Sequence, residues 1–220
     1  VFVSQNHASR YGSCVYVHNG IDFDINLTHS SFRNHFHFLG KAAWRKKNVR
    51  GAIKCAKKAG YTKIDILGGT RLNFSMGFRF TPDSHALFHG MVDNNYKNKI
   101  MSKSRGLVFP VRWNEPFGLA ITESLIAGCP VFGTPYGSLP ELIPNEVGFL
   151  SAKSDELSEA MKNSGQWKPK DCRDFAIENF SSRKMALKYL EIYERVLAGE
   201  ILNKSVPTLQ KQEPKLLPFE

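Results

Sequence analysis

Two glutamates flank a predicted helix start in the segment EPFGLAITE, with seven residues between Glu115 and Glu123. Apolar residues after Gly118 recur at helical spacing until Gly128 ends the pattern. The first backbone N–H groups of a helix are unpaired and its macrodipole is positive there, so the helix start at Gly118 and Leu119 favours an anion such as phosphate. Two carboxylates aimed at that anion would repel it, so we expect them to face hydroxyl groups on either side. A phosphate between two polyols describes a nucleotide sugar.

Two short apolar runs enclose this helix and predict the strands that position it. Leu107–Pro110 has the composition of a buried strand and stops at a proline, and 130–133 begins soon after the helix ends. Strands joined by one helix are usually parallel neighbours, and ligands of such sheets bind at the carboxyl ends of the strands. Glu115, in the loop after the first strand, is therefore expected at the ligand edge.

A second strand, loop and helix unit supplies cations for the same edge. The run HFHFL, His35–Leu39, alternates as a strand does and stops at Gly40, and a helix is predicted from about Asn48 to Ala59. The loop between them places Lys41 and Lys47 at the ligand edge. Two ammonium groups there would bind a diphosphate through charge-assisted hydrogen bonds of about 1.5 to 3 kcal/mol each.

The remaining patterns predict an α/β fold: three Rossmann-like α/β/α layers around a mostly parallel sheet of about six strands. Residues 1–200 form one domain, and 201–220 an extended or disordered tail. In the helix predicted over 94–104, the period of 3.6 directs Tyr96 inward and Lys97 outward. Further elements are predicted as strands at 14–19, 63–67, 86–89 and 148–150, helices at 139–143, 154–163, 170–179 and 181–199, and a loop at 71–83. The last helix carries an apolar stripe that covers the sheet or docks on a further domain.

The segments EPFGLAITE and TPYGSLPELI together resemble the donor site of retaining glycosyltransferases of the GT-B type, the group that includes glycogen synthases and bacterial mannosyltransferases. The resemblance implies that the chain is one half of a GT-B enzyme. It implies that Glu115 reaches the donor sugar and that Glu123 holds the ribose hydroxyls. FLGKAAWRKK is similar to the family's phosphate-binding segment, which assigns Lys41 and Lys47 to the diphosphate and leaving group. The sequence departs from the family pattern at two positions: Lys41 replaces the usual arginine, and Asn48 replaces the common glycine.

The same resemblance implies the rest of the donor site. Phe117, Gly118 and Leu119 form the helix start, and Met91 and Val92 follow a strand at the place where the family's chain runs beside the nucleobase. The family's reaction retains the anomeric configuration, often without a metal, so no cofactor is expected beyond the nucleotide sugar as substrate. The base and the sugar are not identified by these motifs.

The chain begins at Val1 without methionine, and VHNGID resembles the turn by which GT-B chains enter their second domain. We infer a fragment whose N-terminal acceptor-binding domain is absent. Such a fragment is expected to bind nucleotide and to transfer little sugar.

Two short motifs have metal-binding alternatives. His35 and His37 share one strand face, although no third ligand lies near them in sequence, which favours a polar strand face. Asp22-Phe23-Asp24 has the spacing of the metal-binding triplet of the other glycosyltransferase fold, although the turn before it favours a cap. Four well-separated cysteines are expected to be reduced thiols.

Composition limits the other classes of function. With 42% apolar residues and no run approaching the roughly 20 residues that cross a bilayer, the chain is expected to be cytoplasmic or peripheral on the cytoplasmic membrane face. Its net charge of +10 predicts an anionic partner: a nucleotide, an anionic membrane surface or nucleic acid. The alternative to a glycosyltransferase is therefore a basic nucleic-acid or anionic-surface binding module, although no nucleic-acid motif or aromatic platform is evident. A phosphorylase-like enzyme would share the fold.

Overall fold

The computed structural model describes residues 1–22, 33–74 and 78–220. Its centre is a six-stranded sheet in the order β5-β2-β1-β6-β7-β8, with every neighbouring pair parallel. The strands are β1 His35–Leu39, β2 Ile64–Leu67, β5 Ala86–Phe88, β6 Ser104–Phe109, β7 Val131–Gly133 and β8 Gly148–Leu150. The predicted α/β class and the parallel six-stranded sheet are confirmed.

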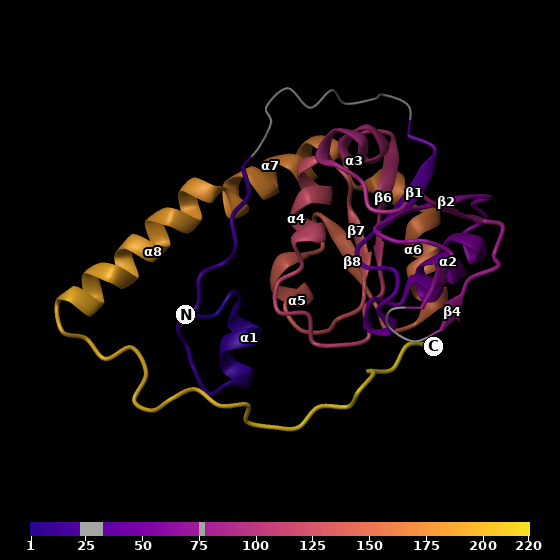
Figure 1. The fold of residues 1–220 in the computed structure, drawn as a ribbon. Helices are drawn as coiled ribbons and strands as arrows, with labels where there is room; N and C mark the ends of the chain where they lie inside the picture. Colours follow the sequence, from indigo (N-terminus) through magenta and orange to yellow (C-terminus); the bar gives the residue numbers. More distant parts are fainter. Residues whose placement is uncertain (23–32, 75–77) are drawn as a thin grey trace.

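Helices cover both faces of the sheet (Figure 1). On one face α2 (Val49–Lys58) packs against α6 (Ser154–Lys162), and on the other α4 (Leu119–Ile126) packs against α7 (Pro169–Phe180) beside α3 (Asn94–Met101). A short helix, α5 (Leu139–Leu142), follows β7. Because the central strands are buried on both faces, runs such as IDIL and GLVF are almost continuously apolar.

Parallel pairing brings the carboxyl ends of β1, β2 and β6 to one edge, where the backbones approach closely. Gly40 N–H donates to Leu67 O at 2.9 Å. Gly68 has φ +112°, and a Cβ at this position would lie 2.5 Å from Gly40 O. Only glycine permits this approach, and the loops after β1 and β2 therefore pack closely at the edge where a ligand was predicted.

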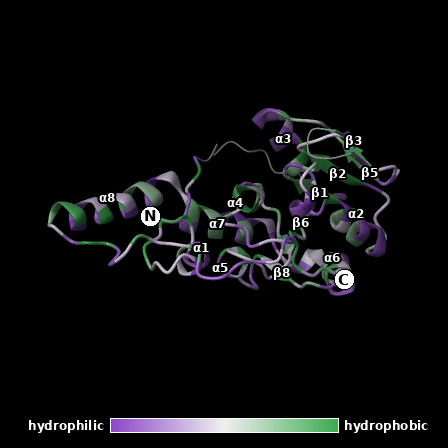
Figure 2. Ribbon diagram, turned by 60° about the horizontal axis from the view of Figure 1, so that its bottom comes forward, coloured by the Kyte–Doolittle hydropathy of each residue, from purple (hydrophilic) through white to green (hydrophobic). Residues whose placement is uncertain are grey.

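The N-terminal segment and α8 (Ser182–Leu197) form a smaller second cluster beside the main body, built on Val15, Val17 and Ile192. The N-terminal segment also contains α1 (Gln5–Arg10). The backbone N–H groups of Gln5 and Asn6, at the start of this helix, donate to the Glu141 carboxylate. Figures 1 and 2 show α8 projecting from the sheet with apolar residues along its length. Its stripe does not cover the sheet, because Leu187, Leu190, Tyr193 and Val196 are about half exposed. No helix in the described ranges has the length and apolar content needed to span a bilayer.

Residues 201–220 contain neither helix nor strand and run back along the molecule toward α2 (Figure 1). Leu217 N–H donates to Arg112 O at 2.8 Å, and Tyr136 Oη donates to Pro218 O at 2.8 Å. Glu220 and Ala152 are joined by a backbone hydrogen bond of 3.0 Å, and the Phe219 ring packs against the core. The segment is extended and attached to the main body.

Several predicted elements differ from the structure. The predicted loop at 71–83 contains a two-stranded antiparallel sheet, β3 (Leu72–Asn73) and β4 (Arg79–Phe80), and the predicted strand at 14–19 makes one bridge, from Tyr16 to Phe2. Strands of two residues are too short to show a period in the sequence. Two single 3₁₀ turns, η1 (Arg45–Lys47) and η2 (Ser164–Gln166), were also not predicted. Phe23 and Asp24 of the acidic triplet lie outside the described residues.

His37 is fully buried on β1, and its side chain is not available for a metal. Hydrogen bonds join Nδ1 to Ser104 Oγ at 2.7 Å and Nε2 to Ser124 Oγ at 2.9 Å, which occupies both ring nitrogens. The neighbouring His35 instead lies 3.4 Å from the Asp65 carboxylate. The polar-strand interpretation of HFHFL therefore describes this pair better than a shared metal site.

The buried imidazole predicts acid sensitivity. Burial lowers the pKa of His37 to about 3, whereas the same group in the unfolded chain titrates near 6.5. Below pH 6.5 the unfolded state therefore binds the extra proton, and the free energy of unfolding should fall by about 2 kcal/mol between pH 7 and pH 5 from this group. Urea unfolding at both pH values, on the parent chain and on His37→Gln, measures the contribution. Equal pH slopes for the two proteins would contradict it.

Candidate functional site

A buried ion pair joins the loops after β1 and β6. Lys47 Nζ lies 2.6 Å from Glu115 Oε2, with the two side chains 14% and 7% exposed. Trp113 Nε1 donates to the same oxygen at 2.9 Å. Both donors reach Oε2, so Oε1 is the carboxylate oxygen that can accept from a bound hydroxyl.

Aromatic rings surround the ammonium group of Lys47. It lies 4.9 Å from the centre of the Phe109 ring and 5.6 Å from that of Trp113, and Lys46 Nζ lies 5.0 Å from the Trp113 ring. Cations are attracted to aromatic faces at these distances. Of the two adjacent lysines, Lys47 is the one that contacts Glu115, which is the register that the sequence predicted.

Asn48 explains why the loop after β1 ends where it does. Its φ of +57° is in the left-handed region, its Oδ1 caps α2 by accepting from Gly51 N–H, and its Nδ2 donates to Pro110 O at 2.9 Å. Glycine suits this backbone best and asparagine tolerates it, which accounts for asparagine where the resembling family commonly has glycine. The side chain also ties the two loops of the site together.

The loop that carries Glu115 is held by the turn after β7. Ser138 N–H donates to Glu115 O at 2.9 Å, and Gly137 N–H donates to Asn114 Oδ1 at 3.1 Å. Gly137 has φ +64°, and a Cβ there would lie 2.2 Å from Glu115 N. The glycine of TPYGS is therefore required for the close packing of the two loops.

More distant parts of the chain hold the same loop. Ser4 Oγ donates to Pro116 O at 2.6 Å, and Arg10 Nη1 donates to Asn114 O at 3.4 Å. Arg112 Nε donates to Leu217 O at 2.7 Å. The backbone around Glu115 is thus fixed by segments from both ends of the sequence.

Glu123, on α4, has its own lysine. Lys97 Nζ of α3 lies 2.7 Å from Glu123 Oε1, with side chains 13% and 29% exposed. The sequence predictions that Tyr96 points inward and Lys97 outward are both wrong, because Tyr96 is 41% exposed and the Lys97 side chain 13%. A lysine at the flank of a helix can bury its apolar stem and still reach a carboxylate on a neighbouring helix, a choice that periodicity alone does not reveal.

A hollow of about 460 Å³ lies at the carboxyl ends of β1 and β2. It is lined by Leu39, Gly40, Lys41, Leu67, Gly68, Met91, Val92 and Lys97. The structure therefore brings Lys41, Met91 and Val92 to one cavity, and Lys97 connects that cavity to Glu123. Met91 is 85% exposed at its rim, and the Lys41 ammonium lies 5.6 Å from the centre of the Trp44 ring.

The start of α4 lies between the two glutamates in sequence. Gly118 is its N-cap, with φ +91° and no side-chain cap, and Leu119 is 47% exposed. The Phe117 side chain is 2% exposed and packs edge-on against Phe180, 5.9 Å between ring centres. At the predicted position of Phe117, only the backbone remains to contact a ligand.

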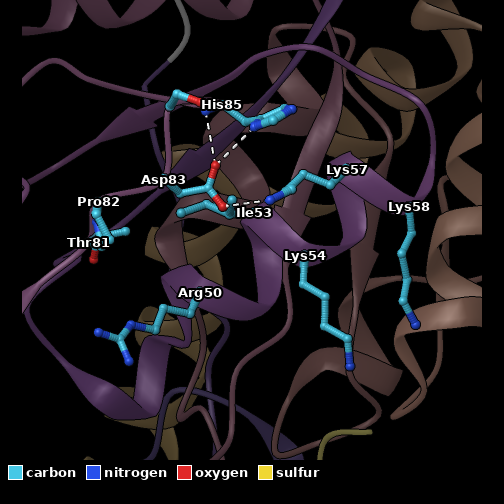
Figure 3. A pocket seen from close by; sticks show the side chains of 10 residues that line it. Arg50, Ile53, Lys54, Lys57, Lys58, Thr81, Pro82, Asp83 and His85 are labelled. Atoms are coloured by element: carbon cyan, nitrogen blue, oxygen red, sulfur yellow. Dashed lines mark hydrogen bonds and ion pairs between the residues drawn. The ribbon is translucent and has the colours of Figure 1, made fainter.

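A larger hollow, of about 610 Å³, lies on the outer side of α2 (Figure 3). Residues of α2 and of the segment 81–85 line it, and of the three lysines of α2 Lys57 points toward Asp83. Lys57 pairs with Asp83 at 3.0 Å, Asp83 also accepts from His85, and Arg50 donates to Phe80 O at 2.8 Å. None of the predicted site residues lines this hollow, but it is the most basic surface of α2.

Comparison with known proteins identifies the family of this chain. The family model described as "Glycosyl transferases group 1" matches residues 33–164, more than half of the chain. An uncharacterized 41.2 kDa protein in the cps region of Klebsiella pneumoniae is 27% identical over 149 residues, 64% of this chain and 40% of that protein. N-acetyl-alpha-D-glucosaminyl L-malate synthase of Bacillus anthracis is 29% identical over 131 residues, 54% of this chain and 32% of that protein. The chain thus spans less than half the length of either curated relative.

Solved structures share the fold. AviGT4, a glycosyltransferase involved in avilamycin A biosynthesis, superposes with a TM-score of 0.74 at 19% identity, over 91% of this chain and 64% of that chain. Sucrose-phosphate synthase of Thermosynechococcus elongatus gives 0.71 at 18% identity, over 90% and 58%. Anabaena Alr3699/HepE, in complex with UDP-glucose, gives 0.63 at 16% identity, over 84% and 57%.

Proposed function

Since this chain belongs to the group 1 glycosyltransferase family, we propose that it is the donor-binding domain of a retaining enzyme. The enzyme would transfer a sugar from a nucleoside-diphosphate sugar to an acceptor that is still to be identified. The observation that carries the proposal is the pair of lysine–glutamate contacts at one sheet edge, Lys47 with Glu115 and Lys97 with Glu123. Lys97 lines the hollow after β1 and β2, and the start of α4 at Gly118 lies between the two glutamates in sequence.

The proposed roles follow from charge and position. Lys41, Lys47 and the N–H groups at the start of α4 stabilise the departing diphosphate, where negative charge grows in the transition state. Glu115 orients the sugar through Oε1, and Glu123 accepts from the ribose hydroxyls. Met91 and Val92 contact the base. With lysines and a helix start for the leaving group, the proposed site needs no metal.

The ion pair also prepares Lys47 for the diphosphate. A lysine ammonium has three donors, and Glu115 Oε2 uses one of them, at 2.6 Å. The remaining donors can bind phosphate oxygens while the carboxylate fixes the position of the nitrogen. An ammonium held in place loses less conformational entropy when the donor binds, and the interaction is correspondingly stronger.

Two findings from the comparisons support the proposed ligand class and a further domain. Alr3699/HepE, which shares the fold, has been solved with UDP and with UDP-glucose, which supports a nucleotide sugar as the ligand of the corresponding edge here. The curated relatives are more than twice as long as the matched part of this chain, which supports a further domain that binds the acceptor. The exposed stripe of α8 is a suitable contact for that domain. We therefore expect the chain alone to bind nucleotide and to transfer little sugar.

Calorimetric titration with UDP, GDP and ADP tests the proposal. The best nucleotide should bind the parent chain, and Glu123→Ala should weaken it by about tenfold, near 1.4 kcal/mol, because the ribose hydroxyls lose a charged acceptor. Glu178→Ala, an exposed glutamate on α7, is the matched control and should bind like the parent. If no nucleotide binds, or if Glu123→Ala and Glu178→Ala behave alike, the assignment is wrong.

The basic side of α2 favours one alternative, binding to an anionic surface or nucleic acid. Arg50, Lys54, Lys57 and Lys58 all line the hollow of Figure 3. Salt-dependent binding to DNA or to anionic vesicles that UDP, GDP and ADP fail to compete would support this alternative. The same surface on a glycosyltransferase would hold the enzyme on the cytoplasmic membrane face, the location we propose.

A further inference from the structure

We propose that Lys97 selects the nucleobase of the donor, favouring a base with an exocyclic carbonyl oxygen over one with an amino group at the same position. The inference rests on the proposed function and extends it, because the family match and the site motifs leave the base open. It assigns a specificity-determining role to a side chain that the sequence pattern directed to solvent.

Lys97 occupies the junction between the proposed ribose and base positions. Its Nζ lies 2.7 Å from Glu123 Oε1, and the same side chain lines the 460 Å³ hollow. A nucleoside whose ribose hydroxyls reach Glu123 therefore directs its base past the Lys97 ammonium into the hollow. One of the three lysine donors is used by Glu123, and two remain for the ligand.

The walls of the hollow suit a flat, largely apolar ring. Leu39, Leu67 and Val92 contribute aliphatic surface, and Gly40 and Gly68 contribute backbone without side chains. The charged residues lining it are the two lysines Lys41 and Lys97, and no carboxylate is among the lining residues. The polarity of the hollow thus favours an electron-rich edge of the base.

Backbone acceptors in the floor of the hollow are already engaged. Leu67 O accepts from Gly40 N–H at 2.9 Å, and Gly68 O accepts from Ala42 N–H at 2.9 Å. Gly90 O, behind Gly68, accepts from two N–H groups, at 2.8 and 3.1 Å. An amino group of adenine or cytosine would enter a site where the carbonyl oxygens of Leu67, Gly68 and Gly90 already accept hydrogen bonds and whose charged side chains, Lys41 and Lys97, are donors.

The Lys97 ammonium group can only donate hydrogen bonds. Lysine donates and does not accept, so a carbonyl oxygen of uracil, guanine or hypoxanthine pairs with it, whereas an amino group places donor against donor. A buried donor that faces another donor loses its hydrogen bond without a replacement. The exchange of a carbonyl oxygen for an amino group on the base should therefore lower nucleotide affinity strongly.

Two ligand pairs carry that change. UDP and CDP differ in the exocyclic group of the pyrimidine, carbonyl against amine, and in the adjacent ring nitrogen, which donates in uracil and accepts in cytosine. IDP and ADP differ in the same two ways on a purine. We expect the carbonyl member to bind the parent chain about tenfold more tightly in whichever pair fits the hollow. Competition against a fluorescent nucleotide analogue, or calorimetry, measures both ratios.

The variant Lys97→Met retains the apolar stem and removes the donors. It should bring the carbonyl-to-amine ratio to within about threefold, while Lys99→Met, exposed on the same helix, should keep the parent ratio. A uniform loss of affinity for all four nucleotides, with the ratio unchanged, would show that Lys97 only positions Glu123 and would overturn the base selection. A parent chain that does not distinguish the members of either pair would overturn it too. If the proposed function is wrong, the assay gives another result: no nucleotide binds the parent chain.

Discussion

Lys47→Met is expected to weaken the binding of the preferred nucleoside diphosphate by about a hundredfold, near 2.7 kcal/mol. On the proposed role of Lys47, the substitution removes charge-assisted hydrogen bonds to the phosphates. It also leaves the Glu115 carboxylate, 6% exposed, without its cation at 2.6 Å and facing an anionic ligand. The loss should therefore lie near the upper end of the range for a single charged hydrogen bond, about 1.5 to 3 kcal/mol. Calorimetry or competition binding on the folded variant measures it.

A double variant distinguishes this explanation from a simple loss of packing. In Lys47→Met/Glu115→Gln the unpaired negative charge is absent, so nucleotide affinity should recover part of the loss, and the two changes should be strongly non-additive. Lys46→Met is the matched control, since Lys46 lies beside Trp113 but does not contact Glu115. Additive effects of Lys47→Met and Glu115→Gln would contradict an ion pair that serves the diphosphate.

Gly137→Ala is the second change with a large expected effect, a loss of about 3 kcal/mol of unfolding free energy and about 6 to 12 °C in Tm. The new Cβ would meet Glu115 N at 2.2 Å and Glu115 O at 2.4 Å, on a backbone with φ +64° that alanine disfavours. The two loops must separate to accommodate it. Thermal unfolding measures the stability, and nucleotide binding should fall with it because the separated loop carries Glu115.

Gly165→Ala is the control for that change, because its Cβ would meet no atom within 4 Å and its φ is not in the left-handed region. It should leave the Tm and nucleotide binding unchanged. A Gly137→Ala protein as stable as Gly165→Ala would mean that the turn after β7 does not brace the site.

The sheet and its principal helices could be predicted from sequence because their signals are local. HFHFL shows the alternation of a strand, and IDIL and the run ending at Phe109 are mostly apolar because both faces of these strands are buried. The helices α2 and α4 begin at residues with recognisable start signals, Asn48 and Gly118. The meeting of Lys47 with Glu115 followed from the rule that parallel strands share a ligand edge. That prediction required only the positions at which the two strands end.

What could not be predicted depends on contacts between distant segments. The distance between α3 and α4 decides whether Lys97 faces solvent or Glu123. The hydrophobic period of a single helix gives no information about that distance. Trp113 has no motif that assigns it to Glu115, although its position two residues before that glutamate was available as a clue. The β3–β4 sheet and the course of 201–220 are likewise set by single side-chain and backbone contacts.

The bracing of the Glu115 loop by Ser4, Arg10 and Leu217 has a consequence for how the chain acquires its site. These contacts have long sequence separations, so they close large loops and form late, after the local strand–helix units. During synthesis the central sheet can assemble while the loop after β6 is still open, and it gains its final support only when residue 217 has left the ribosome. Completion of the edge that carries Glu115 is therefore expected late in the folding of these residues, and a nascent chain interrupted before residue 217 would present a formed sheet with an unsupported loop.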